Sequence, residues 1–128
     1  MLVRVVDATA VSAVLFGEPA ADYIVEQLED AVIIVPTVLE SHLCEICLQK
    51  MDDGDGYDGR YLEALSLLQV MDLHTIKQDP SEIVRFAAEK NITVSEAYYL
   101  RLVYAFDADL VSLNETLIHP ETAEILTA

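Results

Sequence analysis

The chain has 128 residues, of which 53% are hydrophobic and 23% are charged. This length and composition fit one ordinary domain with a core of its own, and they exclude a disordered tail, a collagen-like chain and a disulfide-dense miniprotein. The chain carries 23 acidic and 7 basic residues, a net charge of −16. A general nucleic-acid coat is also excluded, because Lys and Arg drive phosphate binding. A nucleic-acid enzyme of this composition would need a bound cation.

The predicted elements alternate between strands and helices along the chain. Short apolar runs predict strands at 2–6, 32–35, 70–76 and 110–113. Helical patterning and helix-start signals predict helices at 8–16, 20–28, 37–50, 60–68, 80–90 and 93–106. Strands separated by helices form βαβ units. We therefore predict a single α/β domain over residues 1–128, folded as a three-layer α/β/α sandwich with a mostly parallel sheet.

No exported or membrane-spanning segment is expected. The first apolar run, 1–6, contains Arg4 and is too short for a signal peptide. The longest early uncharged stretch, 8–17, is far shorter than a membrane-spanning helix. These features predict a cytoplasmic protein with no membrane partner.

Two cysteines stand at helical spacing inside an apolar run. A zinc site would need further ligands, and only His42 lies close to Cys44 and Cys47 in the sequence. We interpret the pair as buried core thiols in a reducing compartment.

Acidic and amide side chains follow the ends of the predicted strands. Asp7 closes the first strand, Glu40 lies one turn into the helix after the second, and Asn114 follows the last; Glu96 begins the helix before that last strand. In parallel sheets such positions meet at one edge. Converging carboxylates repel one another unless a cation neutralises them, and oxygen ligands favour Mg²⁺ or Mn²⁺.

Four short motifs, taken in order, resemble those of the PIN domain family. They are residues 7–10 (DATA), 35–40 (VPTVLE), 93–100 (TVSEAYYL) and 110–114 (LVSLN). Each motif alone is weak, but the ordered set spans most of the chain. Within this family, the set resembles the VapC-like toxin ribonucleases of type II toxin–antitoxin pairs.

This resemblance implies an endoribonuclease that hydrolyses RNA phosphodiester bonds with Mg²⁺ or Mn²⁺. It implies catalytic roles for Asp7, Glu40, Glu96 and Asn114, and metal ligation by the first three. Thr9 and Ser112 resemble the hydroxyl residues that hydrogen-bond near PIN sites, although ordinary turn chemistry explains them equally well. The resemblance also implies a homodimer and a small basic antitoxin whose segment plugs the acidic pocket. Among the basic residues, Lys50 and Arg60 are the candidates for RNA contacts.

Two departures from the family pattern motivate a second hypothesis. Position 96 is Glu where the family usually has Asp, and position 114 is Asn, which adds no charge; Glu115 is an alternative fourth acid. A catalytically weakened or inactive PIN-like module that binds protein would tolerate both changes.

The acids also have structural interpretations. Thr37 with Glu40, and Thr93 with Glu96, fit the capping box, in which a Glu bonds back to the amide of the helix N-cap. Asp7 has the position of an N-cap for the first helix. The sequence leaves capping and metal ligation open at all three acids.

Overall fold

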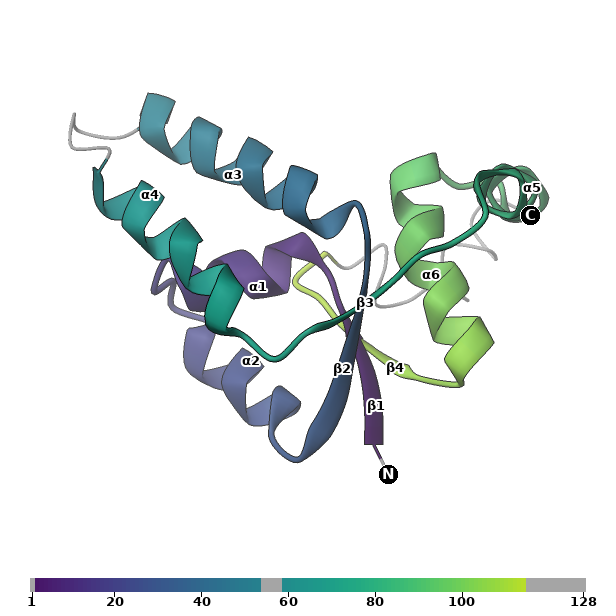
Figure 1. Ribbon diagram of the computed structural model, residues 1–128, viewed down its shortest axis with the longest axis horizontal. Helices are drawn as coiled ribbons and strands as arrows, with labels where there is room; N and C mark the ends of the chain where they lie inside the picture. The colour runs from purple at the N-terminus through teal and green to yellow at the C-terminus, as the bar shows by residue number, and fades with distance from the viewer. Residues whose placement is uncertain (1, 54–58, 115–128) are drawn as a thin grey trace.

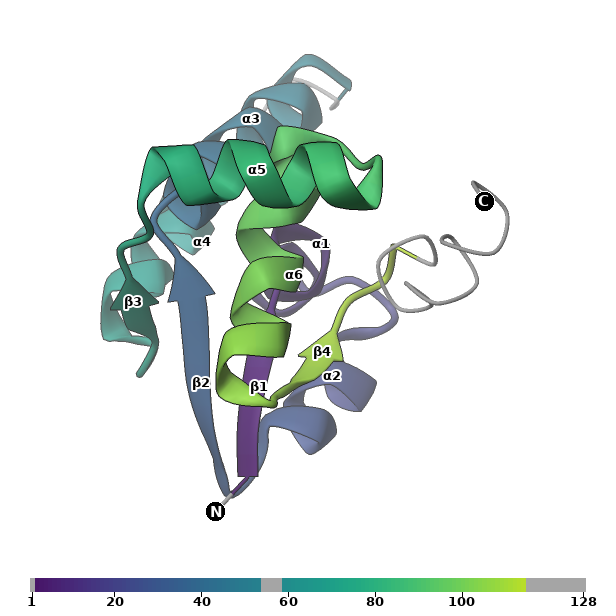
Figure 2. The same cartoon turned by 90° about the vertical axis from the view of Figure 1, so that its right-hand side faces the viewer.

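The computed structural model of the protein describes residues 2–53 and 59–114 (Figure 1). Its sheet has four parallel strands in the spatial order β3-β2-β1-β4, as Figure 2 shows. The strands are β1 (Leu2–Val6), β2 (Ala31–Pro36), β3 (His74–Ile76) and β4 (Asp109–Val111). The predicted α/β class with a parallel sheet is confirmed.

Helices cover both faces of this sheet. They are α1 (Ala8–Leu15), α2 (Ala21–Leu28), α3 (Leu39–Asp53), α4 (Gly59–Ser66), the 3₁₀ helix η1 (Leu67–Val70), α5 (Pro80–Lys90) and α6 (Val94–Phe106). Helix α6 packs on β1 and β2 from one side, and α1 and α2 lie on the other side (Figure 1). Helices α3 and α4 form an antiparallel pair beside α1 (Figure 1). The arrangement is the three-layer α/β/α sandwich expected from the sequence.

The carboxyl-terminal half of the central strand β1 is buried on both faces, which explains why two successive residues there are apolar. Val5 and Val6 are both fully buried. Val6 lies beside Val111 of β4, and the Asp7 N–H donates to the Val111 carbonyl at 3.4 Å. The carboxyl ends of the first and last strands therefore meet.

Among the predicted boundaries that differ from the structure, two affect the segments around the predicted site. The strand expected at 70–76 begins only at His74, because residues 67–70 extend α4 as a 3₁₀ turn and leave Val70 79% exposed. The helix expected from residue 37 begins at Leu39, since the Val38 carbonyl accepts its first hydrogen bond, from the His42 amide. Glu40 is consequently the second helical residue, one position short of where a capping box places its Glu.

The start and end of α5 follow the sequence signals. The Asp79 side chain caps the helix, Pro80 is its first residue, and Asn91 ends it in the left-handed conformation at φ 54°. Glu82 pairs with Arg85 at 2.8 Å.

The cysteine prediction is half right. Cys47 is buried, and burial raises the pKa of its thiol, whereas Cys44 is exposed. The residues one turn apart on α3 thus face different surroundings. Within residues 2–53 and 59–114, none of the helices has the length and apolar character needed to cross a membrane.

Candidate functional site

Asp7 is a buried carboxylate at the carboxyl end of the central strand. It lies between β1 and α1, is 3% exposed, and caps α1 through a hydrogen bond from the Ala10 amide to Oδ1 at 3.1 Å. Thr9 Oγ1 donates to the same oxygen at 2.7 Å, and Ser112 Oγ donates to Oδ2 at 2.5 Å. Three neutral donors therefore hold the carboxylate in one orientation.

The two hydroxyl residues also fix the chain that leaves β4. Thr9 Oγ1 accepts from the Leu113 amide at 2.9 Å, and Ser112 Oγ accepts from the Asn114 amide at 2.9 Å. The hydroxyl oxygens of Thr9 and Ser112 lie 3.4 Å apart. This network ties the first turn of α1 to the segment after the last strand, and it brings Asn114 next to Asp7.

A cavity of about 350 Å³ opens at this edge of the sheet. We call it the acidic cavity; it is lined by Asp7, Ala8, Thr9, His42, Glu45, Ile46, Ser95, Glu96, Tyr99 and Asn114. Three of these side chains are carboxylates, and no Lys or Arg occurs among the described residues that line it. A cation from outside the chain would balance this charge.

Tyr99 of α6 and His42 of α3 form a hydrogen-bonded pair in the wall of the acidic cavity. The Tyr99 hydroxyl lies 2.8 Å from His42 Nδ1, and the ring centroids are 5.7 Å apart. Tyr99 is 3% exposed. Burial raises the pKa of its phenol far above the usual value, the charge of Asp7 adds to the rise, and the Ala8 backbone amide partly offsets it. The phenol therefore stays protonated throughout the neutral range.

The sequence did not identify this pair as functional. In the sequence, His42 stands out only as a neighbour of the cysteines, and Tyr99 is 57 positions away from it. A signal was nevertheless present, because Tyr99 stands one helical turn after Glu96 and shares its face. A polar aromatic residue next to a candidate acid marks a site wall as well as a core position.

Glu96 both caps its helix and lines the acidic cavity. Its Oε1 accepts from the Thr93 amide at 2.9 Å, while its own amide donates to Thr93 Oγ1 at 3.1 Å. This is the complete capping box that the sequence left open as an alternative. The box uses Oε1 of the carboxylate.

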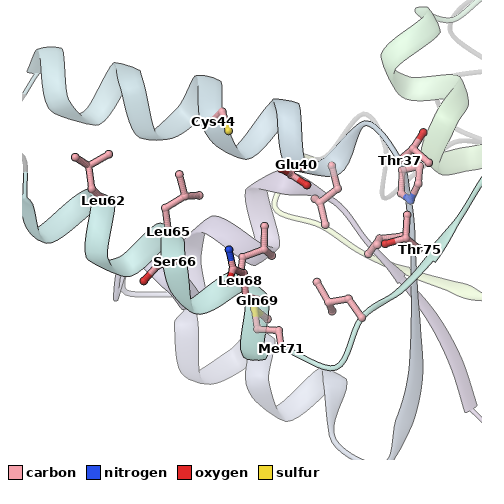
Figure 3. Close-up of a pocket in the computed structure, with 14 residues that line it drawn as sticks. Thr37, Glu40, Cys44, Leu62, Leu65, Ser66, Leu68, Gln69, Met71 and Thr75 are labelled. Carbon is pink, nitrogen blue, oxygen red and sulfur yellow. The ribbon is translucent and has the colours of Figure 1, made fainter.

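Glu40 lies elsewhere. It lines a second cavity of about 550 Å³, the α3–α4 cleft, together with Val35, Pro36, Thr37, Leu39, Cys44, Leu62, Leu65, Ser66, Leu68, Gln69, Met71, Leu73 and Thr75. Figure 3 shows Glu40 and Cys44 on α3 facing Leu65 on α4.

Helix geometry explains this separation. Each residue turns an α-helix by about 100°, so His42 stands about 200° around α3 from Glu40. His42 and Glu45 thus face the acidic cavity, while Glu40 and Cys44 face the α3–α4 cleft.

Of the predicted site residues, the structure brings Asp7, Thr9, Glu96 and Asn114 to one cavity. Ser112 donates a hydrogen bond to Asp7. Glu40 is not among the residues that line it. In the part of the chain that the structure describes, no group of three or more His, Cys, Asp or Glu residues is arranged to hold a metal ion. Glu115 lies outside the described residues.

The basic residues considered for RNA contacts have partners within the fold. Lys50 pairs with Glu18 at 3.0 Å and lies 5.5 Å from the centre of the Phe16 ring. Arg60 stacks on the Tyr61 ring at 4.8 Å. Lys50 therefore joins the last turn of α3 to the residues that follow α1.

The comparisons with known proteins establish the fold. No known protein family model and no curated protein matches the chain. Among solved structures, the chain is similar to the crystal structure of PAE2754 from Pyrobaculum aerophilum, with a TM-score of 0.73 and 16% sequence identity. The match covers 98% of this chain and 94% of that chain. At this identity the likeness identifies a shared α/β/α architecture.

Proposed function

We propose that the protein is a metal-dependent endoribonuclease of the PIN type, similar to VapC toxins, that hydrolyses RNA phosphodiester bonds with Mg²⁺ or Mn²⁺. One observation carries the proposal: the buried Asp7 carboxylate shares a cavity with Glu45 and Glu96, and the described lining contains no basic residue. Gathering negative charge in a partly buried cavity is costly unless a cation compensates it.

The residues of the acidic cavity fit a hard divalent ion. An ionised carboxylate has about four acceptor sites, and Asp7 uses three for Thr9, Ala10 and Ser112. Mg²⁺ is commonly held by one or two protein carboxylates, with waters and substrate phosphates completing its shell. Asp7 and Glu96 meet that requirement without a third protein acid. Ligation by Glu40 remains a prediction, and it needs this side chain to turn away from the α3–α4 cleft.

The mechanism assigns each residue a distinct task. When bound, the ion lowers the pKa of a coordinated water and offsets the charge on the phosphate. Asp7 and Glu96 would hold the ion, and the carbonyl oxygen of Asn114 would add an uncharged ligand. Thr9 and Ser112 keep Asp7 in one orientation through their short hydrogen bonds. The three protein oxygens thereby fix where the phosphate binds.

The partners follow from the same resemblance and from charge. A protein of net charge −16 suits a small basic antitoxin, because opposite charges accelerate and orient association. We extend the proposal to a homodimer in the cytoplasm. A pull-down of the protein with the product of an adjacent or overlapping gene for a small basic protein tests the antitoxin.

The cleavage assay centres on Asp7→Asn. Asn retains the N-cap preference, so the variant should fold while losing the charge of the metal site. We expect its rate of RNA cleavage with Mg²⁺ or Mn²⁺ to fall at least about 100-fold, since metal activation of water supplies most of the rate. Asp72→Asn is the matched control, because the Asp72 side chain is 98% exposed. Equal cleavage by the wild type and Asp7→Asn would identify a contaminating nuclease.

A PIN-like protein-binding module is the second candidate. The uncharged Asn114 and the α3–α4 cleft favour it, because the cleft offers apolar walls from Leu62, Leu65 and Met71. This candidate predicts no metal-dependent cleavage in the same assay. The wild type and Asp7→Asn would then show the same background rate of RNA cleavage.

A further inference from the structure

His42 lines a cavity whose charged side chains, among the described residues, are all acidic. Its Nδ1 is engaged by the Tyr99 hydroxyl at 2.8 Å. The two nitrogens of an imidazole point in divergent directions, so Nε2 is the ring atom that Tyr99 leaves for a ligand. The sequence assigned no role to this residue.

The Tyr99 hydroxyl determines which nitrogen carries the proton. A phenol has one O–H donor, and burial makes an unpaired donor costly. Among the hydrogen bonds of the described residues, the Tyr99 hydroxyl has one partner, the His42 ring. His42 Nδ1 is the acceptor within hydrogen-bonding distance. A neutral ring that accepts at Nδ1 carries its own proton on Nε2.

The pair is held rigidly. Tyr99 is 3% exposed on α6, and His42 is half-buried on α3, so their hydrogen bond joins two helices in the wall of the acidic cavity. Ring centroids 5.7 Å apart at an interplanar angle of 33° add a ring contact to the hydrogen bond. An N–H donor fixed in this way is prepared for an anionic oxygen before the ligand arrives.

We propose that His42 contacts the substrate: its Nε2–H donates a hydrogen bond to a phosphate oxygen of the RNA, and Tyr99 is the positioning residue that fixes the ring and its tautomer. The inference rests on the proposed function, since it names a phosphodiester as the ligand of the acidic cavity. His42 is not one of the residues proposed to hold the ion, so loss of its hydrogen bond would leave Asp7 and Glu96 in place to bind the ion.

The tautomer is measured without any activity. Long-range ¹H–¹⁵N correlation spectra at about pH 8, where an ordinary histidine is neutral, distinguish the two protonation patterns. The signals of His42 are those lost in His42→Gln. We expect the Nε2–H form in the wild type and a mixture of both forms in Tyr99→Phe. An Nδ1–H form in the wild type would overturn the proposal, because Nε2 would then have no proton to donate.

Kinetics test the contact itself. A hydrogen bond to a charged group contributes about 1.5–3 kcal/mol, so we expect His42→Ala to lower kcat/KM on RNA about 10- to 100-fold. Mn²⁺ affinity, measured by calorimetry, should stay at the wild-type value. His42→Gln should recover part of kcat/KM, because its amide also presents an N–H donor. His74→Gln on β3 is the matched control and should leave kcat/KM unchanged. If His42→Ala has the same kcat/KM as the wild type, the proposed contact is wrong. Cleavage of RNA by the wild type in the same experiment would still support the nuclease.

A wild type that does not cleave RNA would reject the nuclease and leave the contact to be tested by binding. The ¹⁵N-labelled protein is then titrated with a short RNA oligonucleotide and Mg²⁺. Movement of the His42 Nε2–H signal, absent in a titration with Mg²⁺ alone, supports the contact. An unmoved signal overturns it.

Discussion

At the scale of single residues, the Asp7 carboxylate owes its position to neutral donors. Ser112 reaches it at 2.5 Å from the far end of the described chain, 105 positions away. Asp7 itself was predictable, because an acid directly after an apolar strand is a recognisable signal. The identity of its donors depends on how β4 pairs with β1, and a single sequence does not encode that contact locally.

The hydrogen bond between Ser112 and Asp7 should contribute measurably to stability. We expect Ser112→Ala to lower the free energy of unfolding by about 1.5–3 kcal/mol, because it leaves a buried charged oxygen with one donor fewer. Urea denaturation measures the change. Ser66→Ala, at an exposed position of α4, is the control and should stay within about 0.5 kcal/mol of the wild type. A loss in Ser112→Ala no larger than in the control would show that water replaces the hydroxyl.

At the scale of elements, the alternation of strands and helices was predictable from apolar runs and helix-start signals. The α5 start at Asp79 and Pro80 and its end at Asn91 were encoded by local chemistry. The short length of β3 and the late start of α3 were not encoded locally. An edge strand and a turn after Pro36 depend on tertiary packing. That late start matters for the site, since Glu40 was expected beside Asp7 and lines the α3–α4 cleft.

The capping role of Glu96 can be tested separately from the metal-binding role that we propose for it. Gln also bonds back to an N-cap amide, so Glu96→Gln should leave stability within about 0.5 kcal/mol while weakening Mn²⁺ binding. Thr93→Ala removes the cap and should cost about 1 kcal/mol of stability with little effect on Mn²⁺. Thermal denaturation and calorimetry measure the two quantities. Glu82→Gln is the control, at the third helical position of α5. Unchanged Mn²⁺ affinity in Glu96→Gln would leave Glu96 with capping alone.

At the scale of the whole molecule, the α/β/α architecture followed from the order of elements, and the strand order β3-β2-β1-β4 then gathers distant residues at one edge. The sequence predicted that acids would meet at this edge. It did not predict the Tyr99–His42 bond, because two helices remote in sequence supply it.

Measurements of metal binding test whether the residues of the acidic cavity act together as one site. Since Asn114 adds no charge to the acids, we expect one Mn²⁺ to bind well and a second to bind weakly without substrate phosphates. Isothermal titration of the free protein should therefore give a single strong site. Mn²⁺ at 100 times its Kd should raise the free energy of unfolding by about 2.7 kcal/mol, and Asp7→Asn should lose this gain. Two strong sites, or an equal gain in Asp7→Asn, would refute the single-ion scheme.

The pairing of β4 with β1 also sets when the site is assembled during synthesis. Asp7 emerges among the first residues, yet its donor at 112 and the amides that reach Thr9 and Ser112 come more than a hundred residues later. A growing polypeptide on the ribosome consequently carries Asp7 without its hydrogen bond from Ser112 until residue 112 has emerged. Full shaping of the cavity therefore waits until residues 112–114 have left the ribosome.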